Sequence, residues 1–240
     1  MPEEQSYCPG KADDGGPHST SNFMGVSLLL APDVLLPRSE TEMLGRRAID
    51  ILSDMAGAPV VIDMCCGSGN LAVGIAHHCP AARIWAADLT DSTVALARRN
   101  VLHNSMADRI SVRQGDLFSA IARDDLLGKV DMVVCNPPYI SSSRLANESA
   151  YLLDNEPSVA FDGGPYGISI LQRLVREAVD YLRSDGWLLF EFGEGQERLV
   201  AALLARTKSY DPPSFAGASG KSRVAVTRRN GRATAPGAGG

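Results

Sequence analysis

The fold is decided by the stretch Val61-Ile62-Asp63-Met64-Cys65-Cys66-Gly67-Ser68-Gly69-Asn70. It begins as a mostly apolar strand and then enters a turn with two glycines, which leads into a helix. Glycine lets the backbone approach a ligand closely, and open α/β sheets bind their ligands at the carboxyl ends of the strands. The stretch therefore predicts an α/β fold with a ligand beside this turn.

The segments around this stretch alternate between strand and helix patterns. Strands are expected at residues 60–65, 83–88, 109–114, 130–135, 186–192, 209–215 and 223–228. Helices are expected after Ser39 and at residues 71–79, 92–104, 168–183 and 196–206, with a short one at 118–123. Such alternation implies right-handed crossovers. We predict a mostly parallel seven-stranded sheet with helices on both faces.

The two ends of the chain differ in composition from its middle. Residues 1–22 are polar and rich in Gly, Pro, Asp and Ser, and residues 230–240 are low in complexity. Such segments bury too little apolar surface to fold alone. We expect a disordered segment at 1–22, one folded domain at 23–229 and a disordered tail at 230–240.

Charge and cysteine content restrict the function further. The net charge is −5, so no global basic field predicts a nucleic acid or an anionic membrane as partner. No signal peptide or membrane span is visible, and the cysteine count is odd, which is typical of a reduced, cytoplasmic protein. Cys65, Cys66 and Cys135 are interpreted as small buried side chains, with a metal site as the less favoured alternative. No metal is expected.

Acidic residues stand at successive strand ends. Asp88 ends the second strand of the 60–135 region, at about the spacing at which an acid binds ribose hydroxyls. Asp116 ends the third, where it would accept from an adenine amine, with Leu117 or Phe118 against the base. Asp63 is interpreted as a third binding acid rather than an interior acid that caps backbone donors. Two glycines instead of three favour an adenosine ligand without a pyrophosphate.

Asn136-Pro137-Pro138-Tyr139 directly follows the apolar strand pattern at 130–135. Two consecutive prolines fix φ and remove two backbone donors, so the strand ends in a stiff loop. The Asn136 oxygen and a proline carbonyl can each accept one N–H of a planar amide or amine, and the tyrosine ring can cover its face. A simple strand-ending turn is the alternative.

Together, residues 63–70, Asp88, Asp116 and residues 136–139 resemble a class I S-adenosylmethionine-dependent methyltransferase, and more closely the HemK/PrmC family. Three further segments resemble that family: the entry segment at 34–42, the loop at 155–164 and the fifth-strand region at 186–193. The resemblance covers residues 23–229. It implies a Rossmann-like class I methyltransferase fold.

The resemblance also implies S-adenosyl-L-methionine as cofactor and a glutamine side-chain amide, in the Gly-Gly-Gln motif of release factors, as methyl acceptor. It implies a catalytic role for Asn136, Pro137 and Tyr139, with Pro138, Arg38 and Glu156 beside the acceptor. For Arg38 and Glu156, the alternative is an ion pair that orders the loops or simple solvated charges. The implied cofactor-binding residues are Asp63, Cys65, Cys66, Gly67, Ser68, Gly69, Asp88, Leu89, Asp116, Leu117 and Asn136.

Departures from the family pattern add further expectations. Cys65 replaces the family's first glycine, so its backbone is expected to adopt a conformation open to other residues. Family members that act on release factors carry a helical N-terminal domain, whereas a short polar segment precedes Phe23 here, so a small amide- or amine-bearing molecule is also a candidate acceptor. The alternatives are a nucleic-acid adenine methyltransferase, which the acidic charge disfavours, and a non-catalytic adenosylmethionine-binding module, which the intact 136–139 motif disfavours.

Overall fold

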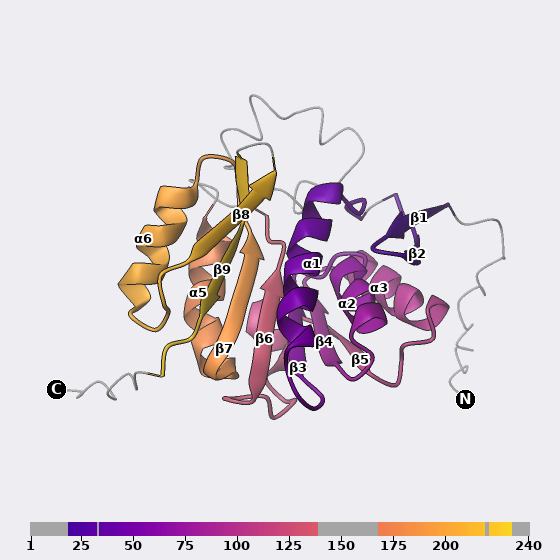
Figure 1. Ribbon diagram of the computed structural model, residues 1–240. Coiled ribbons are helices and arrows are strands. Elements are labelled where there is room, and N and C mark those ends of the chain that lie inside the picture. The colour runs from indigo at the N-terminus through magenta and orange to yellow at the C-terminus, as the bar shows by residue number, and fades with distance from the viewer. Residues whose placement is uncertain (1–18, 33, 139–167, 219–220, 232–240) are drawn as a thin grey trace, which may run out of the picture.

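A seven-stranded sheet forms the centre of the protein (Figure 1). The computed structural model describes residues 19–32, 34–138, 168–218 and 221–231. In spatial order the strands are β5 (Ile110–Gln114), β4 (Arg83–Asp88), β3 (Val60–Met64), β6 (Val130–Cys135), β7 (Leu182–Glu191), β9 (Lys221–Arg228) and β8 (Ser214–Ala218). The first five are parallel, and β9 runs antiparallel to both of its neighbours. This confirms the predicted mostly parallel, Rossmann-like sheet.

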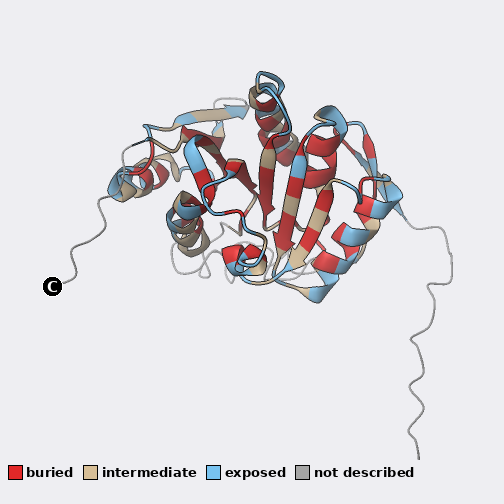
Figure 2. Cartoon of the chain, turned by 90° about the horizontal axis from the view of Figure 1, so that it is seen from below, coloured by how far each residue is buried: buried red, intermediate tan, exposed pale blue. Residues whose placement is uncertain are grey.

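Helices cover both faces of the sheet, because successive strand residues point to opposite sides. Met132 and Val134 of β6 join the core formed with α1 (Ser39–Ser53), α2 (Asn70–His78) and α3 (Asp91–His103). Val133 and Cys135 join the core formed with the 3₁₀ helix η1 (Leu117–Ile121), α5 (Ser169–Tyr181) and α6 (Glu197–Thr207). Figure 2 shows these buried residues in red along the strands, between helices that are exposed on their outer sides.

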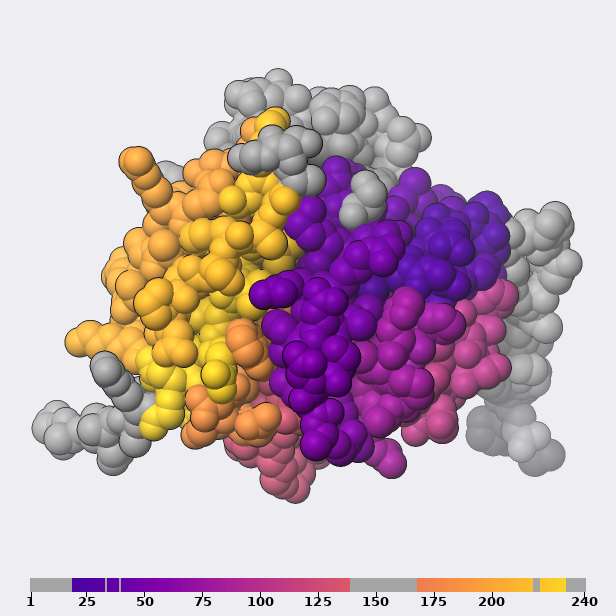
Figure 3. All heavy atoms as spheres, viewed as in Figure 1, coloured from indigo at the N-terminus to yellow at the C-terminus, as the bar shows by residue number. Residues whose placement is uncertain are grey.

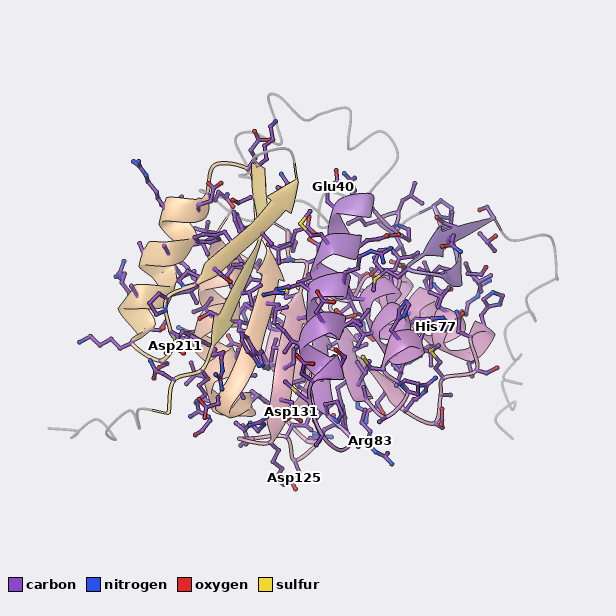
Figure 4. All side chains as sticks on the ribbon, viewed as in Figure 1. Glu40, His77, Arg83, Asp125, Asp131 and Asp211 are labelled. Carbon is purple, nitrogen blue, oxygen red and sulfur yellow. The ribbon has the colours of Figure 1, made fainter. Side chains whose placement is uncertain are left out.

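Helix α1 begins at the same edge of the sheet at which the parallel strands end. In Figure 4, Glu40 in the first turn of α1 lies at the opposite end of the molecule from Arg83 and Asp131, which lie at the starts of β4 and β6. The helix packs against α2, β7 and β9, and Figure 3 shows its surface beside the β8–β9 strands. The first turn of α1 is therefore next to the edge where ligands of such sheets bind.

A two-stranded hairpin precedes α1 and corrects the predicted N-terminal boundary. Its antiparallel strands β1 (Thr20–Phe23) and β2 (Val26–Leu29) include residues 20–22, which were expected to be disordered. These polar residues are ordered because they pair with β2, whose Val26 and Leu28 are buried in the core. The tail was predicted to start at residue 230, which is too early. The backbone N–H of Asn230 donates to the backbone carbonyl oxygen of Ser209 at 2.9 Å, so this residue still belongs to the folded part. Residues 1–18 and 232–240 lie outside the described residues.

Two strand boundaries also differ from the prediction. The strand expected at 209–215 is found as β8 at 214–218, because Pro212 and Pro213 lack the N–H needed for a ladder. Strand β7 begins at Leu182, four residues earlier than expected, because Leu182 pairs with Val130 ahead of an irregularity in the register. None of the helices in the described part of the chain has the length and apolar character needed to cross a bilayer.

Candidate active site

A pocket of about 350 Å³ opens at the carboxyl ends of β3, β4, β5 and β6. A smaller hollow of about 30 Å³ adjoins it and shares Leu35, Cys65, Gly67 and Asn136. The larger pocket is lined by those four residues and by Met64, Ala87, Asp88, Leu89, Thr90, Ser92, Thr93, Gly115, Asp116, Leu117, Pro138 and Ile170. The site is therefore elongated, with Asp88 beside the larger pocket and Asn136 where the two hollows meet.

The turn after β3 holds three residues in left-handed backbone conformations. Cys65 has φ 57°, Gly67 has φ 54° and Gly69 has φ 77°. The expectation for Cys65 is wrong, since this region costs a non-glycine residue roughly 1–2 kcal/mol. Gly67 lines the pocket, and a Cβ built on it would meet nothing within 4 Å. The backbone at Gly67 is thus open to a ligand.

Gly69 lies at the start of α2. It precedes α2 as its N-cap residue, and a Cβ on it would lie 3.3 Å from the Ala97 Cβ of α3. It lines neither hollow, whereas Cys66 and Ser68 line the smaller one. Gly69 therefore allows α2 to pack closely against α3, and its predicted contact with the cofactor stays a prediction.

Asp88 connects two walls of the pocket through its carboxylate. Its Oδ2 accepts from the Gly67 N–H at 2.8 Å. Its Oδ1 accepts from the Leu89 N–H at 2.8 Å and from the Thr93 hydroxyl at 2.9 Å. A carboxylate has about four acceptor positions, so one stays open to a ligand hydroxyl. Sequence reasoning missed Thr93, although the spacing Thr90-x-x-Thr93 at the start of a helix is a capping signal.

Asp116 lies in the pocket wall but is already paired. The Arg173 Nη1 on α5 donates to its Oδ1 at 2.9 Å and to its Oδ2 at 3.0 Å. An adenine amine would therefore share this carboxylate with Arg173, a residue that the sequence did not point to. Leu117 is buried beside it, has φ 49° and lines the pocket, and its predicted contact with the base stays a prediction.

Asp63 is an interior acid, which is the alternative that the sequence analysis had disfavoured. It is fully buried, its Oδ2 accepts from the Ala72 N–H of α2 at 2.9 Å, and it lines neither hollow. Its Oδ1 has no hydrogen-bond partner among the described residues. Burial raises the pKa of Asp63 to about 8; the Ala72 N–H acts in the opposite direction, and the charge of Asp88 adds to the rise.

Replacing Asp63 with asparagine should change how stability depends on pH. The folded protein keeps a proton on Asp63 up to about pH 8, whereas the unfolded chain releases it near the ordinary value of 3.8. The stability that the neutral acid contributes is therefore complete below pH 3.8 and is lost as the pH rises to 8. We expect the free energy of unfolding of the native protein, relative to Asp63→Asn, to fall between pH 5 and pH 8 by up to about 1.4 kcal/mol per pH unit.

Urea denaturation at several pH values measures this difference. The exposed acid Asp108, whose side chain is 79% exposed, provides the control Asp108→Asn. Parallel stability profiles for the native protein and Asp63→Asn would show that Asp63 is not held neutral by burial.

Asn136 lies directly after β6 and lines both hollows. Pro137 is buried behind it, and Pro138 lines the larger pocket. Arg38 is the N-cap residue of α1 and lines neither hollow, so its predicted acceptor role stays a prediction. Tyr139 and Glu156 lie outside the described residues, and their predicted roles also stay predictions.

Two further residues contact this end of the site. The Asn136 Nδ2 donates to the Thr41 Oγ1 at 3.0 Å, and the Thr41 hydroxyl donates to the Glu191 Oε2 at 2.9 Å. Thr41 belongs to the first turn of α1, and Glu191 ends β7. Sequence reasoning gave neither residue a role. The available signal was an acid at the end of an otherwise apolar strand, because buried acids are rare unless they are paired.

Two of the cysteines near the turn, Cys66 and Cys135, are buried thiols. Burial raises the pKa of Cys66 and of Cys135 well above the ordinary thiol value, and hydrogen bonding to Cys65 adds to the rise for Cys135. Within the described ranges, no three His, Cys, Asp or Glu residues are grouped so that they could hold a metal ion. Cys66 and Cys135 are buried, as the sequence predicted for all three cysteines. Cys65 is only half-buried and lines the pocket.

Comparison with known proteins places this geometry among methyltransferases. Residues 49–164 match the family described as Methyltransferase small domain. Four relatives named release factor glutamine methyltransferase are 32% to 37% identical, and this chain spans 60% to 65% of their length. A release factor glutamine methyltransferase of Streptomyces coelicolor is 31% identical over 209 residues, which cover 86% of this chain and 72% of the relative.

A second kind of relative is named for a small acceptor. The 4-amino-L-phenylalanine/4-methylamino-L-phenylalanine methyltransferase of Streptomyces pristinaespiralis is 36% identical over 189 residues, which cover 77% of this chain and 62% of the relative. Among solved structures, the N-terminal domain of human METTL16 in complex with SAH has a TM-score of 0.61 at 16% identity, and the match covers 86% of this chain and 76% of that domain. This last likeness concerns the fold alone.

Proposed function

Because this chain belongs to the HemK/PrmC family of release factor glutamine methyltransferases, we propose that it is an S-adenosylmethionine-dependent N-methyltransferase. The observation that carries the proposal is the position of Asn136, where the two hollows meet, with its Nδ2 engaged by Thr41. This arrangement leaves Oδ1 as the amide atom that can accept from an incoming nitrogen.

The larger pocket fits S-adenosylmethionine. Its volume of about 350 Å³ is in the range of small-molecule sites. The backbone at Gly67 is open to the ligand, Asp88 has an acceptor position for a ribose hydroxyl, and Leu89 and Leu117 provide apolar surface for the base. Asp63 would act indirectly, by holding the start of α2. When bound, the cofactor supplies an electrophilic methyl group on a sulfonium.

The residues after β6 would position the acceptor nitrogen. An amide nitrogen is a weak nucleophile because its lone pair is delocalised, so its orientation matters more than for an amine. Asn136 Oδ1 would accept one N–H, and the Pro137 carbonyl would accept the other. Holding both bonds aims the lone pair at the methyl group, and such orientation can supply several kcal/mol. From the family resemblance, Tyr139 would cover the acceptor, with Arg38 and Glu156 at its border.

Two acceptors fit this arrangement, since both present a planar nitrogen with N–H groups. One is the side-chain amide of glutamine, as in the names of the release factor relatives, and the other is the amino group of a small aromatic amino acid, as in the name of the Streptomyces pristinaespiralis relative. We propose a glutamine-type amide first. The cytoplasmic location and the exclusion of nucleic-acid and membrane partners stay predictions from the sequence.

The test is methyl transfer from labelled S-adenosylmethionine to a panel of acceptors. The panel holds a release factor, a peptide containing Gly-Gly-Gln, 4-amino-L-phenylalanine, DNA and RNA. We expect label on an amide or amino nitrogen of one of the first three, and none on nucleic acid. Label on DNA or RNA alone, or on no member of the panel, would contradict the proposed function.

A further inference from the structure

We propose that Thr41 and Glu191 are positioning residues that fix the side-chain amide of Asn136 with its oxygen toward the acceptor nitrogen. The inference rests on the proposed function, because it concerns the same acceptor. It assigns the orientation of the amide to a hydrogen-bonded chain that begins outside the 136–139 motif.

The hydrogen-bonded series links three side chains: Asn136, Thr41 and Glu191. Asn136, after β6, donates from Nδ2 to the Thr41 Oγ1 at 3.0 Å, and Thr41, in α1, donates to the Glu191 Oε2 at 2.9 Å. Thr41 is 2% exposed and Glu191 is 1% exposed, so water does not compete for these bonds. On the far side, the Arg223 Nη2 lies 3.9 Å from the Glu191 Oε1. The chain therefore begins at a buried carboxylate with a positive charge beside it.

The chemistry of the chain determines which way the amide faces. The Thr41 hydroxyl has a single proton, and it donates that proton to the Glu191 Oε2 at 2.9 Å. The Thr41 oxygen can then only accept from Asn136, and Asn136 must present its NH₂ group to it. The amide oxygen is thereby left for the substrate. A flipped amide would turn two N–H groups toward the N–H groups of the acceptor, and its oxygen would meet a Thr41 oxygen that has no proton to offer.

The same series of hydrogen bonds should make the Asn136 amide oxygen a better hydrogen-bond acceptor. Hydrogen bonds in series polarise one another, and the effect is larger in a buried, low-dielectric setting. The buried carboxylate draws the Thr41 proton, the Thr41 oxygen then draws the Asn136 N–H, and negative charge on Asn136 Oδ1 increases. An oxygen held in this way needs little reorganisation when it orients the acceptor.

The test compares two buried threonines. Thr41→Val removes the middle of the chain and keeps the side-chain shape, whereas Thr41→Ser keeps the hydroxyl. Thr227→Val is the matched control, because Thr227 in β9 is also 2% exposed and its hydroxyl donates to the backbone carbonyl oxygen of Asp211 at 2.7 Å. With the Gly-Gly-Gln peptide as probe, we expect Thr41→Val to lower kcat about tenfold, which corresponds to about 1.4 kcal/mol. Thr41→Ser and Thr227→Val should stay near the native kcat.

S-adenosylmethionine affinity, measured by calorimetry, should be the same in all of these proteins. Glu191→Gln should also lower kcat. A glutamine NH₂ group can donate to the Thr41 oxygen, so the Thr41 hydroxyl proton is free to bind the Asn136 amide oxygen and favour the flipped amide. A loss of kcat in Thr227→Val equal to that in Thr41→Val would indicate a general packing defect and would overturn the proposal.

A second measurement does not depend on methyl transfer. In protein labelled with ¹⁵N-asparagine, the side-chain amide signals of Asn136 are identified by their loss in Asn136→Asp. We expect them to shift and to exchange faster with water in Thr41→Val, but not in Thr227→Val. Unchanged Asn136 signals in Thr41→Val would overturn the proposal. If the native protein methylates no member of the panel, the proposed function fails, and these signals alone decide whether Thr41 holds the amide.

Discussion

Replacing Asn136 with alanine is expected to lower kcat by roughly a hundredfold or more, by analogy with the loss of one preorganised polar contact in other active sites. The Asn136 oxygen is the acceptor proposed to orient the substrate nitrogen, and the neighbouring prolines have no side-chain acceptor to replace it. Affinity for S-adenosylmethionine should change much less, because Asn136 lines only the end of the larger pocket that adjoins the smaller hollow. Steady-state kinetics and calorimetry on the same preparation separate the two effects.

Asn136→Asp is the sharper variant of this experiment. It keeps an acceptor oxygen but loses the N–H that Thr41 accepts, so a new carboxylate oxygen would face a Thr41 oxygen whose proton belongs to Glu191. The added negative charge should bind the cationic cofactor at least as well, while the acceptor is held poorly. We therefore expect a low kcat with undiminished cofactor affinity. An alanine variant with near-normal kcat on the true substrate would reduce residues 136–139 to a strand-ending turn.

The sheet could be predicted from sequence because its signals are local. Strands β3, β4 and β6 are mostly apolar runs, a turn and a helix pattern follow β3 and β4, and the handedness of the crossovers then limits the order of the strands. The errors lie where an apolar run does not mark the bounds of a strand. Residues 20–22 are polar and become a strand only through β2, and Pro212 and Pro213 move the start of β8.

The direction in which the Asp63 side chain points could have been read from the sequence. Side chains alternate along a strand, and Val61 faces the core that contains α2, so Asp63 faces the same side. Its carboxylate therefore meets the Ala72 N–H of α2 instead of the pocket. Asp88 lies on the same face of β4 as Ile84 and Ala86. It is, however, the last residue of the strand, where the sheet edge opens to the pocket.

The partners of the site residues could not be predicted from local patterns. Arg173 lies 57 residues after Asp116, and Glu191 lies 150 residues after Thr41. Neither pair shares a motif or a spacing rule, because both are made by packing helices against the sheet. The motifs therefore predicted which residues surround the pocket, whereas the side chains that orient those residues became visible only in the fold.

Replacing Asp88 with alanine should weaken S-adenosylmethionine binding by roughly ten- to a hundredfold. A hydrogen bond to a charged group contributes about 1.5–3 kcal/mol, and about 1.4 kcal/mol corresponds to a factor of ten. The structure gives a second reason, because the lost carboxylate also releases the Gly67 N–H and the Thr93 hydroxyl, which hold the two sides of the pocket. Calorimetry with S-adenosylmethionine and with S-adenosylhomocysteine measures the change.

The control must separate contact with the ligand from the loss of a negative charge near a cationic cofactor. Asp91→Ala removes the same charge from the start of α3, where Asp91 accepts from the Gln114 side chain at 2.7 Å and does not line the pocket. We expect its affinity to stay within a few-fold of the native value, since an exposed charge at that distance is screened by salt. The neutral product S-adenosylhomocysteine, which lacks the sulfonium, should show the same large loss with Asp88→Ala, because the ribose is identical in both ligands. A folded Asp88→Ala protein with unchanged affinity would remove Asp88 from the cofactor site, and a loss confined to the cationic ligand would assign its effect to charge rather than to ribose binding.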